Sequence, residues 1–237
     1  MELRINNLCK SFDRKVVLNG VEYVFEKGKI YGLLGRNGAG KTTFFNCLND
    51  DLKPNAGEML LDGQPLSSDD IGYVLSTPVV PDFLTGREFL KFFTDINKKK
   101  ISDIKDPDYY FDMVGIKVVD RDKLLRDYSH GMKAKLQIII NIIANTKVLL
   151  LDEPLTSLDV VAAEDMKNAL REQKDDTIMI FSTHIMELAL TLCDEIVLLK
   201  DCKFSKISLY DDNGVKLPDE EIKDIVIDAL REENGND

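Results

Sequence analysis

This sequence of 237 residues lacks the features that mark several classes of protein. No apolar run approaches the ~18 residues that a membrane-spanning helix needs, and the longest, at about residues 136–144, is interrupted by Asn141. The first residues include Glu2 and Arg4 in a strand-like start, so we expect no signal peptide. The four cysteines are scattered without a C-x-x-C or zinc spacing, which predicts reduced thiols. We therefore expect a cytoplasmic protein.

The sequence also has no excess of basic residues. It has 31 lysines and arginines and 42 acidic residues, which gives a net charge of −11. Ten acidic and only three basic residues lie between Asp211 and Asp237, so the rest of the chain is only mildly acidic. Because nucleic-acid binding needs a basic face to meet the phosphates, we expect no nucleic acid among the partners.

A glycine-rich loop is the strongest signal that is present. It fits the pattern G-x-x-x-x-G-K-[ST], which wraps the phosphates of a nucleotide, and consists of Gly35, Arg36, Asn37, Gly38, Ala39, Gly40, Lys41, Thr42 and Thr43. Glycines let backbone N–H groups approach phosphate oxygens, the lysine ammonium reaches the β- and γ-phosphates, and the threonine hydroxyl ligates Mg²⁺. The apolar run before the loop predicts a buried strand, and residues 42–48 predict a helix whose amino terminus faces the anion.

Strand-like and helical segments alternate along the rest of the chain. Apolar runs at 147–151, 177–181 and 195–199 predict strands, and helical patterns lie between them. This alternation predicts an α/β fold of the phosphate-loop NTPase type. Such a fold has a mainly parallel sheet, helices on both faces and ligands at the carboxyl ends of the strands.

Two further parts are expected beside that sheet. Alternating segments such as 2–6 and 21–25 predict an antiparallel β part near the amino terminus. Residues of about 85–145 predict an inserted helical subdomain, in which Thr85 with its following glutamate forms a capping-box pattern and Ser129 is a predicted N-cap.

The chain is expected to end in an extension. We expect one nucleotide-binding domain over residues 1–202 and a C-terminal extension over residues 203–237. Apolar residues at helical spacing from Pro218 onward predict an amphipathic helix with an acidic outer face. The sequence leaves two roles open for this helix, packing on its own domain or making a regulatory or dimer contact.

Short motifs follow the glycine-rich loop in a specific order. They are Leu150-Leu151-Asp152-Glu153-Pro154, Ser157-Leu158-Asp159 and Ser182-Thr183-His184. Together with the loop, these motifs resemble the ATP-binding subunits of ABC transporters, over residues 2 to about 202. The resemblance implies ATP hydrolysis with ATP and Mg²⁺, the loop being the Walker A motif and the strand end the Walker B motif.

The resemblance assigns roles to single residues. Asp152, at a strand end beside the phosphate loop, is placed to hold Mg²⁺ together with Thr42. Glu153 is implied to be the catalytic base that activates the attacking water, and His184 to be the catalytic residue that contacts the γ-phosphate. Considered without the resemblance, His184 could be an ordinary residue at a helix start, since Thr183 is a good N-cap.

Two more residues are assigned in the same way. Phe12 matches the aromatic residue that stacks on adenine, for which the face of a phenylalanine ring suffices. Without the resemblance, a loop aromatic and a core phenylalanine are equal alternatives at this position. Asp159 matches the loop through which two such subunits meet.

Two segments depart from the family's pattern. The signature, usually Leu-Ser-Gly-Gly-Gln, is here Tyr128-Ser129-His130-Gly131-Met132, and Ser129, His130 and Gly131 are implied to face the ATP of the opposite subunit. Three interpretations of His130 remain open: it weakens closure of the two subunits on ATP, it adds a charge-assisted contact to that ATP when protonated, or it is exposed without a role. Ser76 stands where the family has a glutamine that reaches Mg²⁺ and senses the membrane domain. Since serine is shorter by about two bonds, metal contact there needs loop movement or a bridging water.

The resemblance also implies partners. They are a transmembrane permease subunit and a second nucleotide-binding subunit, in a homodimer or a heterodimer, so that the chain would lie on the inner face of the cell membrane. The Gly131-Met132 pair and the short extension resemble bacterial exporters, which favours export. Two alternatives are a soluble ABC-type ATPase that is not coupled to transport and a weakly hydrolysing nucleotide-gated module.

Overall fold

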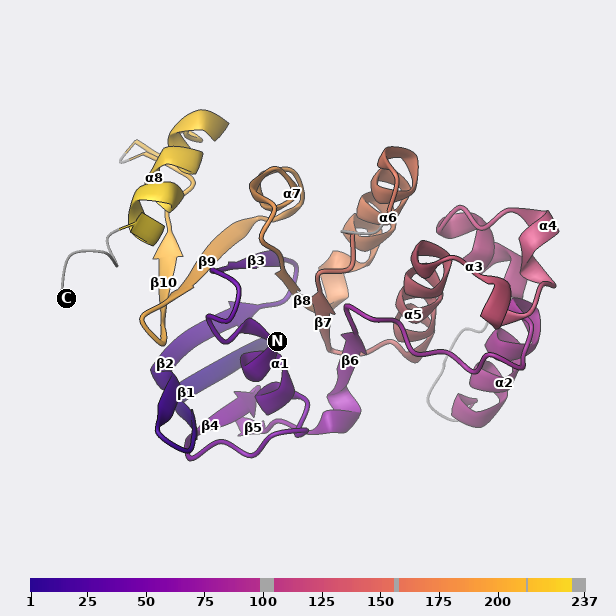
Figure 1. Ribbon diagram of the computed structural model, residues 1–237, viewed down its shortest axis with the longest axis horizontal. Helices are drawn as coiled ribbons and strands as arrows, with labels where there is room; N and C mark the ends of the chain where they lie inside the picture. Colours follow the sequence, from indigo (N-terminus) through magenta and orange to yellow (C-terminus); the bar gives the residue numbers. More distant parts are fainter. Residues whose placement is uncertain (99–104, 156–157, 212, 232–237) are drawn as a thin grey trace.

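The computed structural model describes residues 1–98, 105–155, 158–211 and 213–231, and two β-sheets organise this part of the chain (Figure 1). The smaller sheet has the strand order β2-β1-β4-β5 and is antiparallel throughout. Its strands are β1 (Glu2–Phe12), β2 (Lys15–Glu26), β4 (Ala56–Leu61) and β5 (Gln64–Pro65). The expected antiparallel part is therefore present. Its second strand begins six residues earlier than the apolar run predicted, because pairing with β1 extends it.

The larger sheet has the strand order β10-β9-β3-β8-β7-β6. Its parallel strands are β3 (Ile30–Leu34), β6 (Ile71–Val74), β7 (Val148–Asp152), β8 (Ile178–Ser182) and β9 (Glu195–Lys200), and β10 (Lys203–Ile207) runs antiparallel to β9. Every residue of β3, β7 and β8 is buried, as expected for strands covered on both faces. The predicted mainly parallel sheet is confirmed.

The two faces of this sheet are covered differently. On one face, α1 (Lys41–Leu48) lies between the two sheets, where Phe44 and Phe45 share a core with Leu3 of β1 and Leu150 of β7. The other face is covered by α5 (His130–Ala144), α6 (Val160–Gln173), α7 (Met186–Leu192) and α8 (Asp219–Arg231). Helices therefore cover both faces, as predicted, with the antiparallel sheet backing α1.

A lobe of helices extends from one edge of the parallel sheet (Figure 1). It contains α2 (Gly86–Asn97), α3 (Pro107–Met113), α4 (Val118–Arg121) and α5, with the short 3-10 helix η2 (Leu125–Asp127) before α5. The capping box of Thr85 and Glu88 is formed, and the Ser129 hydroxyl accepts the backbone N–H of Met132. Two other 3-10 helices are η1 (Ser68–Asp70) and η3 (Lys174–Asp176).

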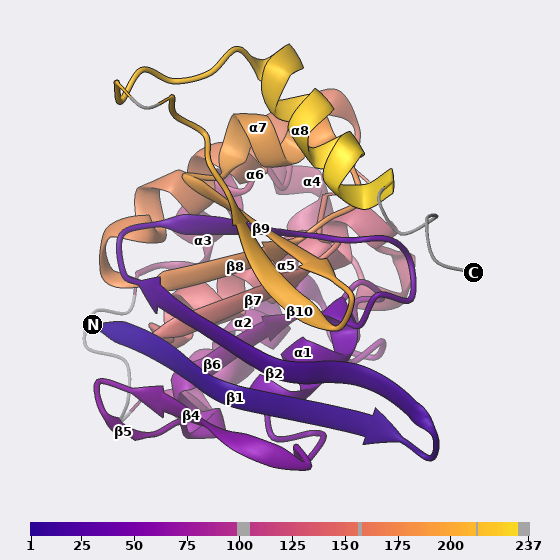
Figure 2. The same cartoon turned by 90° about the vertical axis from the view of Figure 1, so that its left-hand side faces the viewer.

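The C-terminal part of the described chain continues the main domain. Since β10 pairs with β9, the expected boundary at residue 202 divides a hairpin of the larger sheet. Helix α8 lies beside α7 in both views (Figures 1 and 2), and its Ile222 and Val226 are buried against Ala189 and Leu190 of α7. The amphipathic helix therefore packs on its own domain. Within the described residues, no helix is long and apolar enough to cross a membrane.

Candidate nucleotide site

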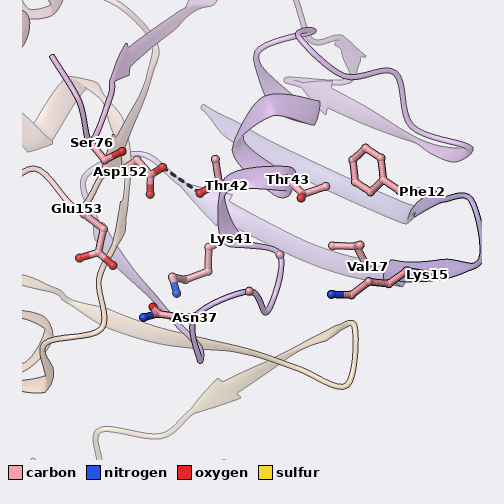
Figure 3. A pocket seen from close by; sticks show the side chains of 12 residues that line it. Phe12, Lys15, Val17, Asn37, Lys41, Thr42, Thr43, Ser76, Asp152 and Glu153 are labelled. Carbon is pink, nitrogen blue, oxygen red and sulfur yellow. Dashed lines mark hydrogen bonds between the residues drawn. The ribbon is translucent and has the colours of Figure 1, made fainter. Parts of the chain in front are cut away.

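A cavity of about 540 Å³ opens where β3 and β7 end (Figure 3). Phe12 lies at one end of it, Ser76, Asp152 and Glu153 lie at the other, and the phosphate loop runs between them. The lining residues are Phe12, Lys15, Val17, Asn37, Gly38, Gly40, Lys41, Thr42, Thr43, Ser76, Asp152 and Glu153. The carboxyl ends of parallel strands are where α/β sheets bind ligands.

The phosphate loop connects β3 to α1 and holds its lysine in place. Gly40 has a φ of 111°, and a Cβ there would lie 2.6 Å from the Val17 side chain, so the turn requires glycine. The Lys41 ammonium donates to the Gly35 carbonyl at 2.8 Å and to the Arg36 carbonyl at 3.4 Å. Burial lowers the pKa of this ammonium, while the negative charges of Glu153 and Asp152 oppose that shift. A cation is thus held at the wall of the cavity, where a phosphate would need it.

Two hydroxyl groups hold the carboxylate of Asp152. Thr42 Oγ1 donates to Asp152 Oδ2 at 3.0 Å (Figure 3), and Ser182 Oγ donates to Asp152 Oδ1 at 2.5 Å. A hydroxyl and a carboxylate are the hard oxygen donors that Mg²⁺ prefers. Among the described residues, no group of three or more His, Cys, Asp or Glu side chains converges on one point. Because Mg²⁺ binds few protein ligands and completes its shell with water and phosphate oxygens, the Thr42 hydroxyl and the Asp152 carboxylate are a donor set that suits it.

Sequence reasoning did not single out Ser182 as a site residue. It is the first residue of the Ser182-Thr183-His184 motif and the last residue of β8. The register of the sheet pairs it directly with Asp152. The available signal was therefore a polar residue at the end of an otherwise apolar strand beside the Asp152 strand.

Glu153, which lines this cavity, forms a pair with His184, which does not line it. His184 Nδ1 lies 2.8 Å and 2.9 Å from the two carboxylate oxygens of Glu153, and since a carboxylate only accepts, Nδ1 carries the proton. The Glu153 N–H donates to the Ser182 carbonyl. Glu153 has a φ of 52°, a strained value for a residue with a side chain, and such strain is concentrated at functional sites.

The opposite end of the cavity is built by the β1–β2 hairpin. The exposed Phe12 ring lies at the end of β1, with the Lys10 ammonium 5.1 Å from its centroid. Lys15 and Val17 of β2 also line the cavity and were missed by sequence reasoning. Lys15 is the residue paired with Phe12 across the hairpin, so the missing information was the register of these two strands.

Other predicted residues lie outside this cavity. Arg36 and Ala39 line a neighbouring pocket of about 230 Å³. Ser129, Gly131 and Asp159 line a separate pocket of about 270 Å³ between α5 and the start of α6. Asp159 is the N-cap of α6 and accepts the Ala162 N–H, whereas Ser157 lies outside the described residues.

His130 lies next to Ser129 but contacts a different segment. Its Nε2 atom is 3.1 Å from the backbone carbonyl of Ser76. The two segments that depart from the family's pattern therefore touch each other in this chain, through His130 and Ser76.

Comparison with known proteins identifies the family. The family model described as ABC transporter matches residues 18–156. The chain is 35% identical over 201 residues to ABC transporter A family member 12 of Arabidopsis thaliana, with 79% of this chain and 21% of that protein covered. This chain thus spans about a fifth of the length of that plant relative. It is also 32% identical to an ABC transporter ATP-binding protein of Methanocaldococcus jannaschii, with 85% of this chain and 75% of that protein covered.

Solved structures agree in fold. The structure of an ATP-binding subunit of an ABC transporter superposes with a TM-score of 0.79 at 23% identity, covering 96% of this chain and all of that one. A putative ABC transporter ATP-binding protein from Pyrococcus furiosus gives 0.72 at 25% identity, covering 84% and 98%. A dimeric ATP-binding cassette bound to ADP and Pi gives 0.73 at 20% identity, covering 87% and 99%. The phosphate loop and the strand end with Asp152 and Glu153 agree with these comparisons. The chain therefore belongs to the ABC transporter family as an ATP-binding domain, and its enzyme class is that of an ATPase.

Proposed function

We propose that this chain hydrolyses ATP as half of a head-to-tail dimer and thereby drives a separate membrane protein. One observation carries the proposal. The phosphate loop and Glu153 line one cavity, whereas Ser129 and Asp159 line another pocket of the same chain. A chain that closes on a second copy, or on a relative, can unite the two halves of the site.

The residues around the large cavity have distinct roles in hydrolysis. Lys41 and the N–H groups of the phosphate loop bind the phosphates. Thr42 and Asp152 would hold Mg²⁺, which supplies positive charge that offsets the developing charge on the phosphates. Glu153 takes the proton of the attacking water at a carboxylate oxygen. His184 donates Nδ1–H to that carboxylate and so orients it, and a contact with the γ-phosphate would need Nε2 to donate as well.

The second pocket would serve the nucleotide of the opposite chain. Ser129 and Gly131 stand at the amino terminus of the 15-residue α5, where free N–H groups and the helix dipole favour an anion. A neighbour of the same fold is a dimer bound to ADP and Pi, which supports this arrangement.

Exposed apolar side chains support a membrane partner. Val79 and Phe83 lie on the loop after β6, and Phe92 and Ile96 are one helical turn apart on α2. Exposed apolar side chains that gather in one patch often mark contacts with other proteins, and the two members of each pair here are four residues apart. We propose that a transmembrane permease docks here and holds the chain at the inner face of the membrane, with export as the direction. The permease would select the substrate.

The Glu153→Gln variant tests this function. The amide keeps the shape and the hydrogen-bonding reach of the side chain but cannot take the proton, so we expect hydrolysis to fall by about 10²–10⁴-fold. ATP binding should persist, and the variant should elute as a dimer with ATP in size-exclusion chromatography. Glu172→Gln, at an exposed position on α6, is the matched control and should behave as the parent. Hydrolysis by Glu153→Gln at the parental rate would remove Glu153 as the base.

A further inference from the structure

The loop that follows β6 is held against one face of α5. Leu75 N–H donates to Gln137 Oε1 at 3.2 Å, and the Lys133 ammonium pairs with Asp82 at 3.2 Å. Lys133 and Gln137 are four residues apart, and His130 precedes Lys133 by three, so the three side chains form one stripe of the helix. The stripe contacts the loop at residues 75, 76 and 82.

His130 forms the contact of this stripe that lies nearest to the nucleotide cavity. Its Nε2 atom is 3.1 Å from the Ser76 carbonyl, and because a carbonyl only accepts, Nε2 carries the proton. Ser76 itself lines the cavity and lies beside Asp152 at the end away from Phe12 (Figure 3). The part of the cavity wall that Ser76 forms is therefore hydrogen-bonded to the first residue of α5.

The backbone around this contact leaves little room for another arrangement. A Cβ at Gly72 of β6 would lie 2.3 Å from the Asn141 side chain of α5, so strand and helix approach closely just before the loop. With β6 close to α5 there and Leu75 bonded to Gln137, Ser76 is the first residue beyond these two contacts, and its carbonyl is held by His130. A glycine at position 130 would offer no donor to the Ser76 carbonyl.

We propose that His130 is a positioning residue for the nucleotide cavity of its own chain. By donating Nε2–H to the Ser76 carbonyl, it keeps the Ser76 segment against the Asp152 end of the cavity and so tightens nucleotide binding. The inference rests on the proposed nucleotide site and assigns His130 a role within one chain, separate from any contact with the phosphate of a second chain.

Binding of MgADP to the full chain separates these roles, because ADP lacks the γ-phosphate that the opposite signature segment would meet. Isothermal calorimetry should give a Kd about two- to tenfold higher for His130→Leu than for the parent, as expected for loss of one hydrogen bond. His130→Gln retains an N–H donor of similar reach and should restore most of the affinity. Lys91→Ala, an exposed position on α2, is the control and should match the parent.

A structural readout accompanies the affinities. Amide hydrogen exchange at residues 76–82 should be faster in His130→Leu than in the parent and close to parental in His130→Gln, with unchanged thermal unfolding of the whole domain. Equal MgADP affinity and equal exchange in parent and His130→Leu would overturn the proposal. So would a variant with parental MgADP affinity and weakened ATP-dependent dimerisation, since His130 would then act on the second chain. A parent that binds no MgADP would instead refute the nucleotide site itself.

Discussion

Two buried tyrosines differ in what their hydroxyl groups contact. The Tyr31 hydroxyl accepts the backbone N–H of Glu26 at 2.8 Å. Among the described residues, the Tyr128 hydroxyl is the one buried side-chain polar atom without a hydrogen-bond partner, and it faces Gly86, where a Cβ would lie 2.1 Å away. Burial raises the pKa of Tyr128 to about 12, so the group stays neutral. An unpaired buried hydroxyl lowers stability by about 1–3 kcal/mol.

The Tyr128→Phe variant should therefore be more stable than the parent. We expect its free energy of unfolding in urea to rise by about 1 kcal/mol, because the substitution removes the unpaired hydroxyl and keeps the ring. Tyr31→Phe is the matched comparison and should lose about 1 kcal/mol, since it leaves the Glu26 N–H unpaired. If both variants lost stability equally, the Tyr128 hydroxyl would have a partner in solution.

A carboxylate between two lysines makes stability depend on pH. Glu195 accepts from Lys29 and from Lys206, each at 2.6 Å. Partial burial tends to raise the pKa of Glu195, but these two ion pairs outweigh it and leave the pKa below its ordinary 4.5. A folded-state pKa below the unfolded value adds stability above about pH 4.5 that is lost as the pH falls through the folded pKa.

Glu195→Gln should accordingly change the pH profile of unfolding. The parent should be the more stable protein at about pH 7, and the difference should shrink as the pH falls from about 5 toward 3, where the parental carboxylate becomes protonated. Urea unfolding of both proteins across this range measures it. A difference independent of pH would mean that the ionised carboxylate contributes nothing to the native state.

At the scale of whole elements, α8 belongs to the folded domain. Ile222 is fully buried and Ile227 is 39% exposed on the same helix. Ile222→Ala should lower the free energy of unfolding by about 2–5 kcal/mol, because it leaves a cavity against α7. Ile227→Ala should lower the free energy of unfolding by well under half of that amount. A single unfolding transition with both effects would show that α8 unfolds with the sheet. If Ile222→Ala instead destabilised only a separate, earlier unfolding transition, α8 would be an extension that unfolds independently of the sheet.

The elements that sequence predicts best are those with strong local signals. Buried strands such as β3 and β7 are continuous apolar runs, and the helix starts at Thr85 and Ser129 carry capping residues, so both kinds were predictable. Pairing between strands that are distant in the sequence has no such local signal. The length of β2, the place of β10 in the sheet and the contact of Ser182 with Asp152 all depend on register between strands distant in sequence.

The same limit applies to the candidate site. The sequence alone was enough to predict that Lys41, Thr42 and Asp152 share one site, because each lies beside the carboxyl end of a parallel strand. The contact between His130 and Ser76 spans 54 positions and joins the first residue of α5 to the loop after β6, so no periodicity or spacing could predict it.

At the scale of the whole molecule, the division of the site between two pockets makes the proposed dimer testable. Lys41→Ala removes the phosphate contact in one cavity and leaves the Ser129 pocket intact. Ser129→Asp keeps a good N-cap for α5 but places a negative charge where a phosphate would bind. A dimer of either variant alone has no complete site, so each should be inactive, and calorimetry should show weakened ATP binding for Lys41→Ala only.

Mixing the two variants should restore hydrolysis. A mixed dimer joins the intact phosphate loop of the Ser129→Asp chain to the intact Ser129 of the Lys41→Ala chain, and so contains one complete site. With random assortment and independent sites, activity should return to about a quarter of the parental rate. Mixing Lys41→Ala with a chain that carries both substitutions provides the control and should restore nothing. If mixed dimers form with ATP and yet stay inactive, the two pockets do not build one shared site, and the head-to-tail arrangement is wrong.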